Sequence, residues 1–473
     1  MSDKGTLLLR LDRPSGFGDR VVAGVADLSL IGANRRNVGK EERRHRVALT
    51  LNGGPNDGKI ELVPGLWQID AVLASGEKIQ DERMVAAQET ITVDLAADRS
   101  PRETLEWQHL SGQVAGHEVH AMRRERQTLP AVPKWLRTSV DISGFPSDAV
   151  GSQGAGLETG LGPVLPPISL DEFAGTLTFD QFAGPAPVTK CSYYGQADAA
   201  AMWQMLVDTL DSRHTVLPAG LNVLGQEEQQ VHDLYSSFIV PDSHLQITDP
   251  DEGVGERAHY WAIVEAPSGS SLLSLPVPWY DRDGSSRDVG ILVRHVSNET
   301  SLAEVAVRDP DIAAMLGYLR NNRFEEAAFV AKDFERWLWS KRRNPYAAAA
   351  GGYVLLATQL GFENAPWTGW IRNLNAWFPT IPDGAVLEGY MCLNGPKPLR
   401  DFERAAACFQ SAFERGIPHY TIGLSWLRSG LRSLEADFGH LKAAAETVSL
   451  ASRLAETSQV FSSFRLKREP VND

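Results

Sequence analysis

The stretch DFERAA at residues 401–406 is the clearest copy of a pattern that recurs in the last third of the chain. Related stretches are RFEEAA at 323–328, GFENA at 361–365 and DFGHL at 437–441, and their phenylalanines lie 36 to 40 residues apart. A period in this range is typical of stacked helical hairpins, each of which needs a neighbour to bury its apolar face. The sequence therefore predicts an α-solenoid over residues 311–460.

The clearest copy has helical spacing of its apolar residues. Phe402, Ala405, Ala406 and Phe409 follow one another at intervals of three, one and three residues. Small residues at such positions let a neighbouring helix approach closely, while aromatic residues fill the space between hairpins. With Pro418 after it, this segment resembles the second helix of a tetratricopeptide (TPR) repeat. The resemblance implies a concave face that binds a peptide or helix of another protein.

Half of the tryptophans of the chain lie in this helical region. Trp and Arg are frequent anchors of protein interfaces. The residues that we predict to bind a partner are Trp367, Trp370, Arg372 and Trp377. Trp367 and Trp370 should be partly exposed, because Pro366 interrupts the repeat pattern beside them. The alternative is that these tryptophans belong to the core.

The first part of the chain has the alternation of β-strands. In residues 67–73, Trp67, Ile69, Ala71 and Leu73 alternate with polar or smaller residues, after a Pro-Gly turn. Alternating segments separated by turns predict an antiparallel β-sandwich over residues 1–110. The stretch LVPGLWQIDA at 62–71 resembles the hairpin of carboxypeptidase-regulatory-like and related immunoglobulin-like modules, which implies a spacer or docking module.

The remaining ranges complete a multidomain α+β protein. Residues 111–196 are rich in Pro, Gly and Ser and predict an irregular connector. Residues 197–310 predict a second β-rich domain with one leading helix, which includes a buried strand at 259–264. The solenoid follows at 311–460, and 461–473 is assigned to a C-terminal tail.

Composition excludes several classes of function. The formal net charge of −14 opposes binding to nucleic acid, which requires a clustered positive surface. No run of apolar residues has the length that a membrane-spanning helix needs. The three cysteines are too few and too widely spaced for a disulfide framework. A cytoplasmic protein without membrane association is expected.

Catalytic candidates are few. His117 and His120, with His109 upstream, could offer imidazoles to a metal, but their spacing differs from that of metalloprotease helices. Cys191 could be a nucleophile only if the fold brought a histidine close to it. We therefore predict no catalytic residue, no metal site and no cofactor. The alternative is a hydrolase, metal-dependent or not, that uses these residues.

The predicted function is a non-enzymatic adaptor that binds a protein partner through the helical region. The block GGYVLL at 351–356, followed by DGAV at 383–386, resembles uncharacterised bacterial proteins encoded beside caspase-like peptidases. This resemblance implies a regulator, partner or substrate of a protease in a bacterial defence or signalling system, with residues 130–190 as the region of cleavage.

Overall fold

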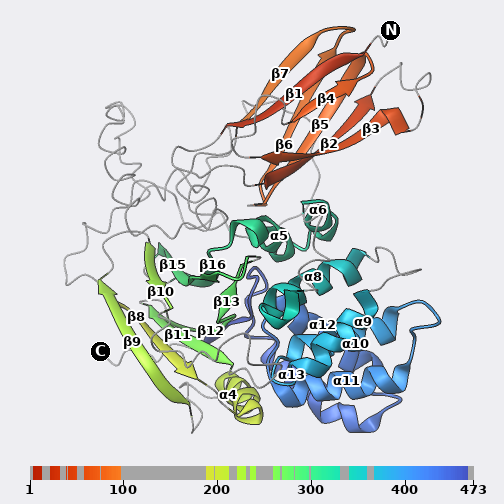
Figure 1. Cartoon of the computed structure of the whole chain (residues 1–473). Coiled ribbons are helices and arrows are strands. Elements are labelled where there is room, and N and C mark those ends of the chain that lie inside the picture. The colour runs from red at the N-terminus through yellow and green to blue at the C-terminus, as the bar shows by residue number, and fades with distance from the viewer. Residues whose placement is uncertain are drawn as a thin grey trace, which may run out of the picture. The chain divides into compact units, whose positions relative to one another are not determined.

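The structure is a computed structural model of the whole chain (Figure 1). The residues that it describes are 4–12, 22–31, 39, 41–50, 58–74, 76–96, 188–195, 198–211, 221–230, 235–240, 259–266, 269–281, 283–297, 300–330, 340–358 and 367–466. The segment from 97 to 187, which holds most of the predicted connector with His109, His117 and His120, lies outside this range.

The N-terminal part consists of two sheets. Their strands are β1 (Gly5–Asp12), β2 (Val22–Ile31), β3 (Arg44–Thr50), β4 (Lys59–Leu62), β5 (Gly65–Leu73), β6 (Lys78–Val85) and β7 (Thr90–Ala96). One sheet has the antiparallel order β3-β2-β5-β6. The other has the order β4-β1-β7 and is mixed, because β1 runs parallel to β7. Along β5 every second residue is buried, as the alternation of residues 67–73 predicts.

The central part also has two main sheets. Its elements are β8 (Val188–Gly195), α4 (Ala199–Asp211), β9 (Asn222–Gln230), β10 (Tyr235–Ile239), β11 (Tyr260–Ala266), β12 (Gly269–Leu275), β13 (Trp279–Tyr280), β14 (Ser286–Arg287), β15 (Val289–Ser297) and β16 (Thr300–Val307). The larger sheet has the antiparallel order β17-β12-β11-β8-β9, in which β17 is Ser463–Leu466, and the smaller has the order β10-β15-β16. β11 is buried from Tyr260 to Val264, as expected of a strand without alternation.

The edge strand β17 comes from the other end of the chain. β17 (Ser463–Leu466) pairs with β12, from which nearly two hundred residues separate it. The sequence placed these residues in a tail and placed residues 188–195 in the connector, whereas the structure forms β17 and β8 there. The central sheet and the helical region are therefore joined by backbone hydrogen bonds as well as by chain connectivity.

The C-terminal part is helical. Its helices are α5 (Pro310–Arg320), α6 (Phe324–Val330), η8 (Ser340–Arg342), α8 (Pro345–Thr358), α9 (Trp367–Trp377), α10 (Pro382–Asn394), α11 (Phe402–Arg415), α12 (Thr421–Leu434), η10 (Gly439–Leu441) and α13 (Lys442–Ala451). Three of the recurring phenylalanines mark element starts, because Phe324 and Phe402 begin α6 and α11 and Phe438 precedes η10. The fourth, Phe362, lies outside the described residues. Among these residues no helix is both long and apolar enough to cross a membrane.

Helix α10 lies at the centre of this part. It packs against α8, α9, α11 and α12, and residues 382–389 of it are all buried. Helix α8 is likewise buried from Pro345 to Leu356. An open solenoid would expose one side of such helices to a ligand. The structure confirms a helical C-terminal part but does not confirm a solenoid.

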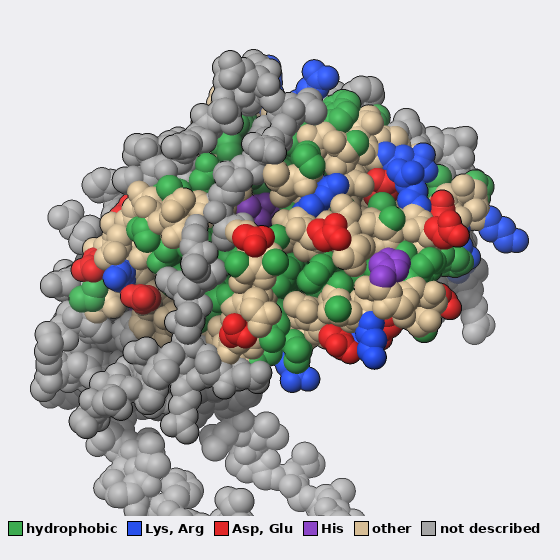
Figure 2. Space-filling model, turned by 90° about the horizontal axis from the view of Figure 1, so that it is seen from below, with side chains coloured by type: hydrophobic (Ala, Val, Ile, Leu, Met, Phe, Trp, Pro, Cys, Tyr) green, Lys and Arg blue, Asp and Glu red, His purple; other side chains and the backbone are tan. Residues whose placement is uncertain are grey.

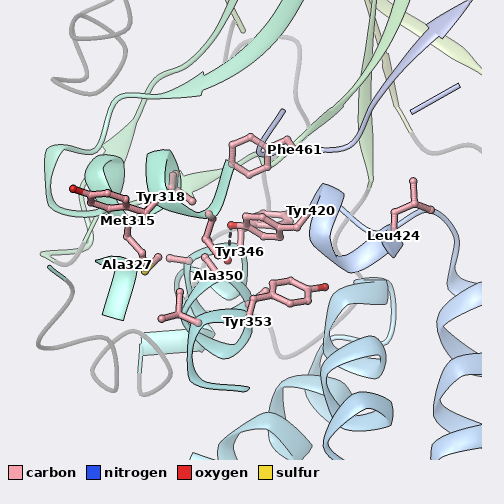
Figure 3. Close-up of a cluster of buried hydrophobic side chains, with 14 of the residues drawn as sticks. Met315, Tyr318, Ala327, Tyr346, Ala350, Tyr353, Tyr420, Leu424 and Phe461 are labelled. Atoms are coloured by element: carbon pink, nitrogen blue, oxygen red, sulfur yellow. Dashed lines mark hydrogen bonds between the residues drawn. The ribbon is translucent and has the colours of Figure 1, made fainter. Parts of the chain in front are cut away.

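The core of the helical part is rich in aromatic residues, which Figure 3 shows meeting from several elements. Tyr346 and Tyr353 come from α8, Tyr420 from the residue before α12, and Phe461 from the segment before β17. The Tyr420 hydroxyl donates a hydrogen bond of 2.8 Å to the carbonyl of Tyr346. These rings attach the segment that leads into β17 to the helices.

The phenylalanines of α11 have two different environments. Phe409 is fully buried, and its ring lies against Gly389 of α10 and Gly430 of α12. Phe402 is instead an exposed side chain. The expectation that aromatic residues fill the space between neighbouring helices thus holds for Phe409 and is wrong for Phe402, which only begins the helix.

Candidate functional site

Helix α9 has one buried face and one exposed face. Trp367, Trp370, Ile371 and Leu374 are buried, and their spacing of three, one and three residues puts them on one stripe of the helix. Ala376 lies on the opposite side and is exposed. The helix is therefore anchored through its tryptophans and presents a separate surface to solvent.

The predicted exposure of Trp367 and Trp370 is wrong. Their side chains are 2% and 9% exposed. Pro366 does interrupt the repeat pattern, but a regular helix begins directly after it and turns both tryptophans inward. Arg372 and Trp377, the other two predicted binding residues, keep exposed surface.

Arg372 approaches a carboxylate that is almost completely buried. Glu388 of α10 is 1% exposed, and Arg372 Nε lies 3.9 Å from its Oε1. Arg404 of α11 donates to the same oxygen from Nε at 2.6 Å and from Nη2 at 2.5 Å. Asn375 of α9 donates to Oε2 at 2.7 Å. Three helices thus meet at one acidic side chain.

This cluster leaves positive charge at the surface. A buried carboxylate is stable only with well-placed partners, and Arg404 with Asn375 supplies them. Hydrogen bonding to Glu388 raises the pKa of Arg404 further. The side chains of Arg372 and Arg404 are 46% and 52% exposed. Arg372 and Arg404 carry two positive charges and Glu388 carries one negative charge, so the three side chains together have a net charge of +1. The buried Glu388 orients the groups that carry it.

Trp377 has cationic neighbours on the other side of α9. The Lys341 Nζ lies 4.8 Å from the centre of its ring, and the guanidinium carbon of Arg342 lies 5.1 Å from it. Burial and the neighbouring Arg342 lower the pKa of Lys341. Contacts of this length between a cation and an indole are attractive. Trp377 is thereby held at the surface with its ring covered by positive charge.

We call the exposed side of this helix, with its neighbouring cations, the α9 face. It consists of Gly369, Arg372, Ala376, Trp377, Arg342 and Arg404. On the face that Figure 2 shows, acidic and basic side chains are interspersed. The net charge of the chain is negative, so a partner would be selected by a local group of charged side chains such as the α9 face and not by the electrostatic field of the whole chain.

A second polar cluster lies where the central sheet meets the helices. The Ser274 hydroxyl of β12 is 3.0 Å from His259 Nε2 and 2.9 Å from His419 Nδ1. The two imidazoles stack with their centres 3.9 Å apart, and His259 also stacks on Trp261. Burial lowers the pKa of His259 to about 3 and lowers that of His419 strongly. Both rings are therefore neutral near pH 7 and share hydrogen bonds with one hydroxyl.

The same cluster continues to a buried aspartate. Asp383 of α10 accepts hydrogen bonds from the His419 backbone N–H at 2.8 Å, the Tyr420 N–H at 3.3 Å and the Tyr353 hydroxyl at 2.7 Å. Burial raises the pKa of Asp383 to about 6, although these hydrogen bonds act in the opposite direction. Asp383, His419 and Ser274 are each at most 1% exposed. The described residues thus connect β12 to α10 through groups that solvent does not reach.

Of the predicted hydrolase residues, only Cys191 lies among the described residues. Cys191 is fully buried in β8, and burial raises the pKa of its thiol to about 12, so the reactive thiolate is disfavoured. His109, His117 and His120 lie outside the described residues. Within the part that is described, no group of acidic, histidine and cysteine side chains could hold a metal ion.

Sequence reasoning missed Glu388, Arg404, Ser274 and His419. The one local signal was Glu388 itself, a charged residue in the otherwise apolar segment AVLEGYM at 385–391. A buried acid of this kind usually has a cationic partner. Its partners come from helices before and after α10, so the sequence alone does not identify them.

Comparison with known proteins relates the helical part to one family. Residues 314–470 match the family model of the Y4kD C-terminal domain. The matched segment runs from within α5 through α13 and includes β17, so it contains both the α9 face and His419. No curated protein and no solved structure matches the chain. The comparisons do not support a TPR, an immunoglobulin-like module or an association with caspase-like peptidases.

Proposed function

We propose that the chain is a non-enzymatic adaptor that binds a protein partner through its Y4kD-like helical part, with the α9 face as the contact surface. The observation that carries this proposal is the arrangement around Glu388. A buried carboxylate holds Arg372 and Arg404 half-exposed beside a helix that its own tryptophans anchor. Arginine and aromatic side chains held in place in this way are typical of binding surfaces.

The adaptor is built from modules with different roles. The N-terminal sheets, as a β-sandwich of the immunoglobulin-like kind, would act as a spacer or docking module, and the helices would stack as a TPR-like array. The function that we propose for the whole chain is cytoplasmic regulation of a protease of the caspase-like kind, as its partner or substrate, in bacterial defence. Binding to nucleic acid or to a membrane is not part of this function.

Site-specific crosslinking tests the contact surface. A photo-crosslinking amino acid at Ala376, which is exposed on α9, should attach one discrete protein in the native host. The same amino acid at Met84, an exposed residue of β6, serves as the matched control. The yield of the crosslinked species should fall when Arg372 is changed to Gln. Equal products from Ala376 and Met84, or none from Ala376, would remove the α9 face as a partner-binding site.

A hydrolase is the second candidate, because one observation favours it. Ser274 lies within hydrogen-bonding distance of two neutral imidazoles, and either ring could accept its proton if a substrate reached the hydroxyl. Reaction with a fluorophosphonate, with loss of labelling in Ser274→Ala, would favour this function. Because the hydroxyl is fully buried, we expect no labelling of the native protein.

A further inference from the structure

We infer that the occupant of the α9 face is an acidic segment of the partner, whose carboxylates bind Arg372 and Arg404. This inference rests on the proposed function and adds the chemistry of the partner to it. The argument has three parts: the donors that the arginines retain, the length of the face, and the sign of its charge.

The arginines retain hydrogen-bond donors. A guanidinium has five N–H groups in a fixed plane, and Arg404 uses those of Nε and Nη2 on a single oxygen of Glu388. The contact of Arg372 with Glu388 is longer, with 3.9 Å between Nε and Oε1. The remaining N–H groups of the two half-exposed side chains suit carboxylates, which guanidinium groups bind with two parallel hydrogen bonds.

Glu388 also fixes where these donors are. Holding a long side chain in one rotamer costs conformational entropy at the moment of binding, unless the free protein already holds it. Glu388, itself bound by Asn375, supplies that constraint to Arg404 through a hydrogen bond, and it attracts Arg372 across 3.9 Å. Two acids precede Arg404 in the chain: Asp401 accepts a hydrogen bond from the Arg404 backbone N–H as the cap of α11, and Glu403 is exposed.

The face is longer than a single small anion. From Gly369 to Trp377 the helix rises by roughly 12 Å, at 1.5 Å for each residue. Cations lie near both sides of this stretch, with Arg372 and Arg404 on one side and Arg342 over Trp377 on the other. A segment of several acidic residues can contact both sides, whereas one phosphate cannot.

Gly369 offers a clean test, because a Cβ atom there would meet nothing within 4 Å. Gly369 and Arg372 are three residues apart and are neighbours on the helix surface. A charged side chain can therefore be added beside Arg372 without disturbing Glu388 or its partners. Gly369→Glu and Gly369→Lys differ only in the sign of the added charge, so each is the control for the other.

The experiment measures binding of a fluorescent oligoglutamate peptide to the full chain by anisotropy at low salt. The dissociation constant should rise roughly threefold in Arg372→Gln and in Gly369→Glu, and fall by a similar factor in Gly369→Lys. Oligolysine should not bind. Added salt should weaken oligoglutamate binding in the wild type.

Several results would overturn the inference. The first is an equal affinity of Gly369→Glu and Gly369→Lys for oligoglutamate, and the second is that oligolysine binds as tightly as oligoglutamate. The third is that inorganic phosphate, at an equal concentration of charge, displaces the peptide. The fourth is that a second copy of the chain occupies the α9 face. The last would appear as a dimer that Arg372→Gln dissociates. If oligoglutamate fails to bind while Ala376 still crosslinks one protein, the acidic occupant is wrong and the adaptor stands. If both fail, the adaptor fails with it.

Discussion

Replacing Asp383 by asparagine should reveal an acidic group that destabilises the fold as it ionises. Asp383 is fully buried, and its hydrogen bonds from Tyr353 and from the backbone N–H groups of His419 and Tyr420 offset its burial only in part. Its pKa is therefore about 6 in the folded protein, whereas the ordinary pKa of an aspartate side chain is 3.8. Asparagine has a similar shape and does not titrate.

The sign of the effect follows from proton linkage. Between the two pKa values the folded state binds more protons at Asp383 than the unfolded state, so stability falls as the pH rises. The contribution of Asp383 is fully present below its unfolded pKa and is lost as the pH passes its folded pKa. A difference of about two pKa units corresponds to about 3 kcal/mol. This direction is opposite to that of an aspartate in a surface salt bridge.

The histidines impose the opposite trend on the wild type. Burial lowers the pKa of His259 to about 3 and that of His295, which lies among the hydroxyls of Thr189, Ser236 and Ser301, to about 4. Their contributions are present above about pH 6.5 and are lost as the pH falls. The wild type alone therefore does not isolate Asp383, whereas the difference between it and Asp383→Asn does.

The assay is urea unfolding followed by far-UV circular dichroism between about pH 4 and about pH 7. The free energy of unfolding of Asp383→Asn should rise by about 2–3 kcal/mol relative to the wild type over that range. Asp437→Asn, at an exposed position after α12, is the control and should show no such change. A difference that stays constant or moves in the other direction would refute the proposed cost of ionising Asp383.

Three further predictions concern packing. Gly430→Ala should lower the free energy of unfolding by about 1–3 kcal/mol, because its Cβ would lie 2.2 Å from the Phe409 ring. Gly369→Ala should raise the free energy of unfolding by about 0.5–1 kcal/mol, because its Cβ would lie in open space and alanine favours a helix more than glycine does. Denaturant titration measures both changes. A chain that ends before Ser463 should unfold at a lower temperature in circular dichroism, because β12 loses its partner β17. Cys191 should resist alkylation in the native protein and react after unfolding, as mass spectrometry would show.

Local patterns predicted the elements whose burial follows a short period. The alternation in β5 and the unbroken apolar run of β11 each specify which faces are buried, so the strands could be placed before their partners were known. Helix α4 is the leading helix that the sequence predicts for residues 197–310. The start of α5 at Pro310 agrees with the preference of proline for the first helical position.

Features that depend on distant contacts were not predictable in this way. β17 has only four residues and no distinctive pattern, and it becomes a strand because β12 offers an edge. The arrangement around Glu388 requires α9 and α11 to lie on α10 together, which no single helix encodes. The exposure of the tryptophans was misjudged for the same reason, since the α9 stripe becomes visible only once the helix is placed directly after Pro366.

The pairing of β17 has a consequence for the matched family segment itself. Residues 314–470 include β17 but not β12, so the segment alone would leave the N–H and C=O groups of β17 that face β12 without their partners. It would also separate His419 from Ser274, a hydrogen bond of 2.9 Å at a fully buried position. Both losses fall on the side of the helices that contacts the central sheet. The helical part should therefore be stable only when β17 has a partner strand, and in this chain β12 is that strand.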